Sequence, residues 1–268
     1  MTMLISSEDL QSLRHAYESL EHPGMRIKIM DMLGTPIEKG FQLLPDSVEK
    51  GISTTCNIAI SKAADFALFS MRNASPQESS DWFHRVSVWA TGAAGGFGGI
   101  PGTLIEIPVS TTIMLRSIFD IARSEGENIF DNDTRLAALQ VFAFGGHAKS
   151  DDTANTAYYA TRMAMAYEVK QAYEFLAKGA GKLVDKNAPA LIQLIQKIAT
   201  RFSIPVTEKA VAQAMPFVSA VIGLTINDIF IAHFQDVARG HFTVRRLERK
   251  YGKELVQQIY ESFNNKNQ

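Results

Sequence analysis

One acidic residue stands out for its surroundings. Glu106 has apolar neighbours on both sides in the segment Thr103-Leu-Ile-Glu-Ile-Pro108. A carboxylate among apolar side chains is ion-paired, has a raised pKa, or faces a polar cavity. Glu106 is therefore the best single candidate for a functional group. The structural alternative is a buried ion pair with Arg116 or Arg162.

A second group of polar residues interrupts an apolar segment near the C-terminus. Asn227, Asp228 and His233 lie there, but Asp228 and His233 are five residues apart and share a helical face poorly. No His-Glu-x-x-His motif occurs, so no metal signature is present in the sequence. A catalytic site built in three dimensions would draw on Glu106, Asp120, Asp228 and His233. Asp120 follows an arginine by four residues, a spacing that favours a structural ion pair.

The most unusual segment is the glycine-rich run Gly92-Ala-Ala-Gly-Gly-Phe-Gly-Gly-Ile-Pro-Gly102. It is not a phosphate loop, because the Gly-Lys-Ser/Thr ending is missing, and Pro101 breaks the dinucleotide fingerprint. Glycines four residues apart instead permit close helix packing. We expect this run to form a binding surface together with polar residues from other segments. The expected binding residues are Gly95, Gly96, Gly98, Gly99, Pro101, Glu106, Arg116, Arg162 and Asn227.

Two long tracts contain no charged residue. Residues 86–105 and 210–227 are uncharged, and the first has the length of a membrane span. Small residues make up more than half of that first tract, so it is only weakly apolar. We expect a buried helical hairpin rather than a transmembrane helix, with reversible lipid contact as the alternative.

The C-terminal region carries a basic segment. The segment contains four basic residues, Arg245, Arg246, Arg249 and Lys250, and one acidic residue, Glu248. Such a segment is either an ion-paired helix face or a surface for an anionic membrane, where each basic residue contributes about 1 kcal/mol. Interleaved aromatic residues typical of nucleic-acid binding are missing, so we expect no nucleic-acid partner.

Helix signals dominate the rest of the 268 residues. Capping residues and three-to-four spacing predict helices that start near Ser6, Pro36, Asp46, Asp81, Ala154, Asn187, Thr207, Pro216 and Thr243. The only alternating, strand-like pattern is residues 103–108. We predict an all-α, single-domain multi-helix bundle with a central glycine-rich helix hairpin, divided into an N-terminal helical extension (1–45) and a main helical domain (46–268).

Three blocks of sequence resemble the EcsC protein family. They are GAAGGFGGIPGTLIEIPVSTTIMLRSIFDIARSEGE (92–127), VFAFGGHAKSDDTANTAYYATR (141–162) and a C-terminal block, 206–252. The resemblance extends over about residues 80–260. It implies no settled activity and no catalytic residues. The founding member is encoded beside an ABC transporter, which implies a membrane-protein partner.

These features lead to two hypotheses. The first is a non-catalytic protein that binds lipid or a membrane-protein partner at the cytoplasmic membrane face. The second is a cytosolic metal-assisted hydrolase. A single cysteine, Cys56, and an N-terminus without a secretory signal favour the cytoplasm, and the formal net charge of −1 argues against a protein that coats nucleic acid. We expect no cofactor.

Overall fold

The computed structural model describes residues 5–22, 24–33, 45–70, 100–145, 157–178, 189–213 and 220–264. Within these ranges every regular element is a helix, which confirms the predicted all-α bundle. The elements are α1 (Ser7–Glu21), α2 (Met25–Leu33), α4 (Asp46–Asp65), the π-helix η1 (Phe66–Ser70), α6 (Ile100–Ser124), α7 (Asn132–Phe144), α8 (Ala157–Ala177), α9 (Pro189–Gln213), α10 (Ala220–Tyr251) and α11 (Lys253–Ser262). The glycine-rich run before residue 100 and the expected helix starts near Pro36, Asp81 and Pro216 lie outside the described residues.

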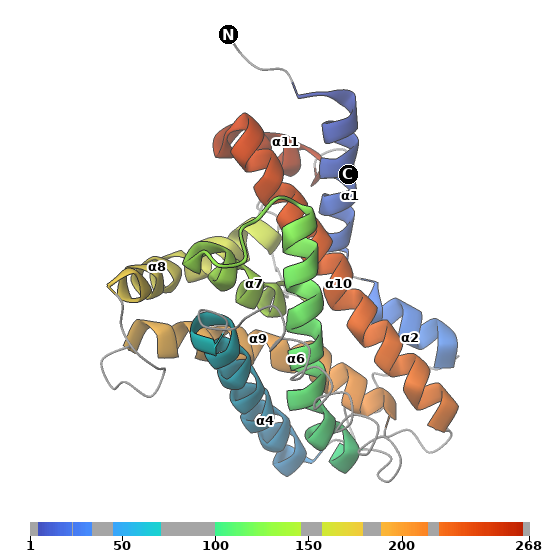
Figure 1. Cartoon of the computed structure of the whole chain (residues 1–268). Helices are drawn as coiled ribbons and strands as arrows, with labels where there is room; N and C mark the ends of the chain where they lie inside the picture. Colours follow the sequence, from blue (N-terminus) through green and yellow to red (C-terminus); the bar gives the residue numbers. More distant parts are fainter. Residues whose placement is uncertain are drawn as a thin grey trace.

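The longest of the described helices, α10, packs against α1, α2, α6, α7, α9 and α11 (Figure 1). Its 32 residues extend about 48 Å. Helix α1 lies along one side of α10 and α6 along another, while α4 packs against α6 and α9. Helix α8 packs on α9 and α7. Helices distant in sequence therefore depend on α10 and α9 for their positions.

Helices α6 and α10 run in the same direction. Gln235 donates to Ser117, Thr243 donates to the Glu125 carboxylate, and Arg245 pairs with Glu127. Each of these contacts joins residues 118 positions apart. Because the offset is constant, the N-terminal halves of both helices lie at one end of the molecule and their C-terminal halves at the other.

Two helices continue through an internal proline, and this corrects the sequence-based boundaries. The strand-like segment 103–108 lies within α6, which contains Pro108. The two helices expected from Asn187 and Thr207 are one helix, α9, which contains Pro205. Proline removes one backbone donor and usually ends or kinks a helix, but burial of the apolar faces of α6 and α9 on both sides of each proline holds these helices together.

Helix α1 begins and packs as its residue types require. The Ser6 side chain accepts a hydrogen bond from the Asp9 backbone N–H, which confirms the predicted N-terminal cap.

Helix α10 continues through Gly240, where the sequence predicts a break between Ala238 and Thr243. A Cβ at Gly240 would lie 2.9 Å from Leu20 Cγ and 3.1 Å from the Ala16 carbonyl oxygen. The missing side chain is what lets α1 approach α10 so closely.

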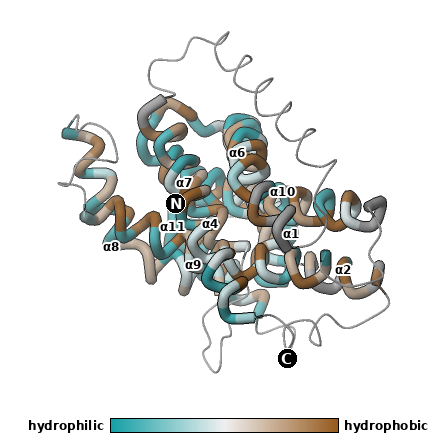
Figure 2. The backbone as a smooth tube through the Cα atoms, turned by 90° about the horizontal axis from the view of Figure 1, so that it is seen from below, coloured by the Kyte–Doolittle hydropathy of each residue, from teal (hydrophilic) through white to brown (hydrophobic). Residues whose placement is uncertain are grey.

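The interior is a single apolar core with aromatic rings at its centre. Phe142, Phe202, Phe230 and Phe234 pack edge-to-face or tilted, with ring centroids 5.2–6.2 Å apart. Such pairs add about 0.5–1.5 kcal/mol beyond the burial of their area. Hydrophobic and hydrophilic residues alternate along the helices in Figure 2, as amphipathic packing requires.

Candidate functional site

The predicted residue Glu106 meets a lysine that is buried in the core. Lys209 Nζ, on α9, lies 2.9 Å from Glu106 Oε1 on α6 and 2.8 Å from Asn227 Oδ1 on α10. Nζ also lies 4.8 Å from the centre of the Phe230 ring. The Lys209 side chain is 1% exposed and that of Glu106 is 28% exposed. Burial lowers the pKa of Lys209, and the neighbouring Glu106 carboxylate opposes that shift.

The partner of Glu106 corrects the sequence-based expectation. Arg116 and Arg162 were the expected partners, and Lys209 takes that role. Arg116 lies ten residues further along α6, about 15 Å away along the helix axis. One feature of the sequence could have identified Lys209 as the partner: it is the last charged residue before the uncharged tract 210–227. Of the predicted binding residues, Glu106 and Asn227 are brought together.

The four proposed catalytic residues do not form one site. Glu106 and Asp120 are 14 residues apart on α6, about 21 Å along the axis. Asp120 is exposed and pairs with Arg123, and Asp228 is exposed. His233 is buried with Nε2 2.8 Å from the Gly145 carbonyl oxygen. Among the described residues no three His, Cys, Asp or Glu side chains are placed to hold a metal ion.

Besides Arg116, the structure describes two more of the predicted binding residues, Arg162 and Pro101. Arg162, on α8, makes a bidentate pair with Glu248 on α10, with distances of 2.7 and 3.0 Å. Pro101 lies in the first turn of α6. The glycines Gly95, Gly96, Gly98 and Gly99 lie outside the described residues.

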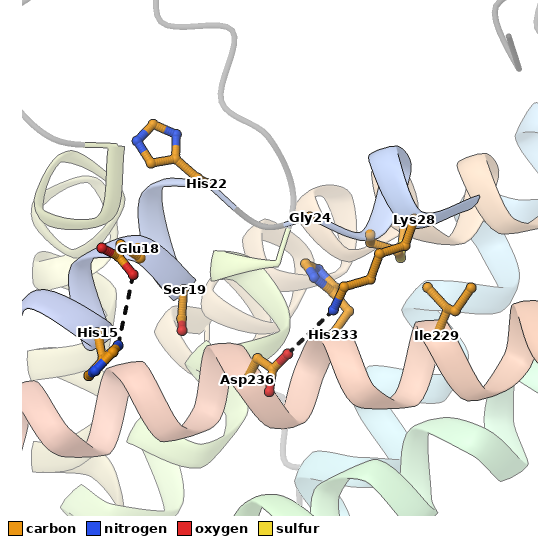
Figure 3. Close-up of a pocket in the computed structure, with 10 residues that line it drawn as sticks. His15, Glu18, Ser19, His22, Gly24, Lys28, Ile229, His233 and Asp236 are labelled. Carbon is orange, nitrogen blue, oxygen red and sulfur yellow. Dashed lines mark ion pairs between the residues drawn. The ribbon is translucent and has the colours of Figure 1, made fainter. Parts of the chain in front are cut away.

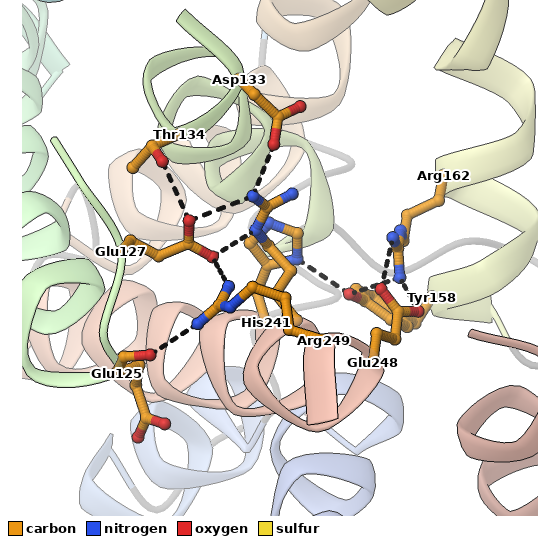
Figure 4. Close-up of polar contacts among 10 residues, drawn as sticks. Glu125, Glu127, Asp133, Thr134, Tyr158, Arg162, His241, Glu248 and Arg249 are labelled. Carbon is orange, nitrogen blue, oxygen red and sulfur yellow. Dashed lines mark hydrogen bonds and ion pairs between the residues drawn. The ribbon is translucent and has the colours of Figure 1, made fainter. Parts of the chain in front are cut away.

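The basic C-terminal segment pairs with acids of the same molecule (Figure 4). Arg245 contacts Glu127 and Asp133 at 2.8 and 2.7 Å, and Arg249 also contacts Glu127. These pairs fix the end of α10 against the turn after α6 and the start of α7.

The other two basic residues of the segment reach α1. Arg246 contacts Asp9 and Glu125, and Lys250 contacts Asp9 at 2.7 Å. These contacts fit the ion-paired face that the sequence left open as an alternative to a membrane surface. All four predicted membrane-surface residues thus have acidic partners within the chain.

A buried polar cluster that the sequence did not reveal lies beside these pairs (Figure 4). Tyr158 Oη accepts a hydrogen bond from Arg162 and shares a second hydrogen bond, of 2.8 Å, with His241 Nδ1. The other ring nitrogen of His241, Nε2, is buried and has no hydrogen-bond partner among the described residues. Burial lowers the pKa of His241 well below its usual value, and Arg245 and Arg162 add to that effect. Burial also raises the pKa of Tyr158, so neither group ionises near neutral pH.

A pocket of about 270 Å³ opens between α1, α2 and the middle of α10 (Figure 3). The sequence had singled out one of its lining residues, His233. His15 Nδ1 lies 3.8 Å from Glu18, and Lys28 Nζ lies 4.0 Å from Asp236. His15 and Lys28 thus each lie near a carboxylate at the rim of the pocket, and the four side chains are 45–70% exposed.

The outer surface of α8 and α9 has an unusual composition. On α8 the exposed side chains from residue 160 to 167 are all uncharged: Ala160, Met163, Ala164, Ala166 and Tyr167. Met163 and Tyr167, one turn apart, are each 68% exposed. Ile192 and Ile204 are exposed on α9. Lys197 joins the two helices, because its Nζ donates to the Ala164 carbonyl and pairs with Glu168.

Exposed charges on this surface are mainly positive. Lys170, Lys178 and Lys197 are exposed, and Glu174 is the only exposed acid on the described α8 and α9. We refer below to these exposed side chains of α8 and α9 as the α8–α9 surface. No described helix combines the length and the apolar character needed to cross a membrane.

The comparison with known proteins supplies a family. The model of the EcsC protein family matches residues 7–247 of the 268, so the chain belongs to this family. The match includes α1, which the resemblance noted from sequence blocks did not reach. No curated protein and no solved structure matches the chain.

Proposed function

We propose that this member of the EcsC family is a non-catalytic accessory protein that binds the cytoplasmic face of a membrane, through lipid or through a membrane-protein partner. The α8–α9 surface carries the proposal. Exposed Met163 and Tyr167 form an apolar centre, and the lysines around it outnumber the single acid. Exposed apolar groups with a polar rim are typical of interaction surfaces.

The chemistry of this surface suits an anionic bilayer. Tyrosine is favoured at membrane interfaces, where its ring is apolar and its hydroxyl reaches water. Among the described residues no acidic side chain pairs with Lys170 or Lys178, and both are exposed toward solvent, where lipid headgroups could reach them. Each basic group near an anionic surface contributes about 1 kcal/mol. The basic residues of the C-terminal segment are not needed for this interaction.

Vesicle sedimentation tests the proposal. We expect the full chain to sediment with vesicles that contain anionic phospholipid, to remain soluble with neutral vesicles, and to release as salt rises. The double variant Met163→Glu/Tyr167→Glu places two negative charges on the α8–α9 surface and is expected to reduce binding at least tenfold.

The matched control is Ile58→Glu, a substitution at an exposed apolar residue of α4 that is 48% exposed. It is expected to leave binding unchanged. Equal losses in both variants would contradict a role for the α8–α9 surface. A third outcome would identify a membrane protein, and not lipid, as the partner. In that case the chain binds neither kind of vesicle, and it binds native membranes only while their proteins are intact.

A further inference from the structure

The two helices that carry the Lys209–Glu106 pair each contain a proline close to the pair. In α6, Pro108 follows Glu106 by two residues, and in α9, Pro205 precedes Lys209 by four. Proline has no N–H, so the carbonyl four residues earlier receives no helical hydrogen bond from it. Both helices are therefore weakened next to the ion pair.

Hydroxyl side chains around each proline weaken the helices further. In α6, Thr111 Oγ1 donates to the Ile107 carbonyl and Thr112 Oγ1 to the Pro108 carbonyl, both at 2.7 Å. In α9, Ser203 and Thr207 donate to carbonyls three and four residues earlier, also at 2.7 Å. Such bonds compete with the backbone ladder and often bend helices.

The terminal segments beyond the two prolines are joined to each other. Glu106 lies in residues 100–107 of α6, and Lys209 lies in residues 206–213 of α9. Lys209 bonds both Glu106 and Asn227 of α10, and Gln213 Nε2 approaches the Gly223 carbonyl at 3.5 Å. Three helix ends thus form one unit, separated from the rest of α6 and α9 by a proline in each.

We infer that the Lys209–Glu106 pair is a latch that holds this unit closed, with Pro108 and Pro205 as the hinges. When the latch is released, residues 100–107 and 206–213 open together while the remaining parts of α6 and α9 stay folded. Opening exposes the apolar surroundings of Phe230 at the end of the molecule where α6 and α10 begin. This inference rests on the contacts of Lys209 and does not depend on membrane binding by the α8–α9 surface.

Backbone hydrogen exchange of the full chain, read by peptide mass spectrometry, tests the latch. Glu106→Gln is expected to speed exchange in residues 100–107 and 206–213 by roughly tenfold, equivalent to about 1.4 kcal/mol. Residues 114–122 and 191–199, on the other side of each proline, are expected to keep their rates. Faster exchange on both sides of Pro108, or no change at all, would overturn the inference.

The matched control removes a comparable ion pair between helices without proline. Glu248→Gln breaks the Arg162–Glu248 pair of α8 and α10, and it is expected to leave residues 100–107 at the wild-type rate. A second variant covers the case in which Glu106→Gln does not fold. Pro108→Ala restores a backbone donor to α6 and is expected to slow exchange in residues 100–107, and unchanged exchange there would also overturn the inference.

Discussion

The Lys209 ammonium group donates to the Glu106 carboxylate and to the Asn227 side-chain oxygen, and it lies over the Phe230 ring. The two ends of the ion pair differ in exposure, because Glu106 reaches solvent and Lys209 does not. Removing one partner leaves the other charge unpaired. The loss of stability depends on whether the remaining charge is buried or in contact with water. The two possible truncations are therefore not equivalent.

We expect Glu106→Ala to lower the free energy of unfolding by about 3 kcal/mol, since it leaves a buried ammonium without a counter-charge. Lys209→Met should cost less, about 1 kcal/mol, because the Glu106 carboxylate can be hydrated and methionine fills a similar volume. Urea denaturation at pH 7 measures both values. A larger loss for Lys209→Met would contradict this account of the pair.

The buried side chain of His241 is expected to make the free energy of unfolding depend on pH. Burial lowers its pKa in the folded chain, whereas the unfolded chain binds a proton near pH 6.5. Below that pH the unfolded state takes up a proton that the folded state does not, so stability falls as the pH falls, by up to about 1.4 kcal/mol per unit. Urea titrations between pH 5 and pH 7.5 measure the slope.

The variant His241→Gln should flatten that slope, because it removes the group that titrates only on unfolding. The control is His15→Gln, at a side chain that is 70% exposed. An unchanged slope in His241→Gln would assign the pH dependence to other groups.

Sequence reasoning identified some of these residues and missed others for definable reasons. Glu106 was found because a carboxylate among apolar neighbours is conspicuous. Lys209 was missed because pairing across α6, α9 and α10 depends on helix register, which no local pattern contains. Tyr158 and His241 look like ordinary helix residues until α8 and α10 are packed together. The four residues of the predicted joint site, Glu106, Asp120, Asp228 and His233, are not brought together. Asp120 lies about 21 Å from Glu106 along α6, Asp228 is exposed, and the His233 ring bonds the Gly145 carbonyl.

Several helices were predicted from the sequence, but their boundaries at prolines were not. Capping residues predicted α1, α4 and both halves of α9, and three-to-four spacing predicted α8. Proline was expected to end a helix, yet Pro108 and Pro205 lie inside α6 and α9 because packing on both sides outweighs one missing hydrogen bond. Tertiary contacts thus decided what local propensity left open.

Two glycines of α10 test the close approach between helices. At Gly240 an added Cβ meets the Ala16 carbonyl at 3.1 Å and Leu20 Cγ at 2.9 Å, whereas at Gly223 it meets nothing within 4 Å. Gly240→Ala should lower the melting temperature, because α1 must move away from α10. Gly223→Ala should raise stability by up to about 1 kcal/mol through helix propensity alone.

Thermal unfolding of the two variants checks this prediction, with Gly223→Ala as the control for propensity. If Gly240→Ala were as stabilising as Gly223→Ala, the close packing of α1 would not be a structural constraint.

At the scale of the whole molecule, α1 connects the beginning of the chain to its end. The Asp9 carboxylate accepts hydrogen bonds from Lys250 and Tyr251 and pairs with Arg246. Glu21, at the other end of α1, accepts from Tyr260 of α11 and from the first backbone N–H groups of α8. These contacts place α1 within the same folded unit as α8, α10 and α11.

Asp9→Asn should reveal the contribution of this connection. The hydrogen bonds from Lys250 and Tyr251 hold the pKa of Asp9 well below its usual range, so the stabilisation is complete above about pH 4 and is lost as the pH falls further. We expect the variant to lose about 1–2 kcal/mol at pH 7. The difference in stability between the variant and the wild type should shrink below pH 4. Urea denaturation at pH 7 and below pH 4 measures this difference, and an equal difference at both would contradict the role of Asp9.

The contact between Asp9 and Lys250 also has a consequence for biosynthesis. The two residues are 241 positions apart in the chain. At a ribosomal rate of roughly 5–20 residues per second, the first helix is made about 12–48 s before its partner. During that interval Leu13, Tyr17 and Leu20, which end in the core, have no α10 to cover them. The apolar side of α1 therefore stays uncovered in the nascent chain until α10 has been made.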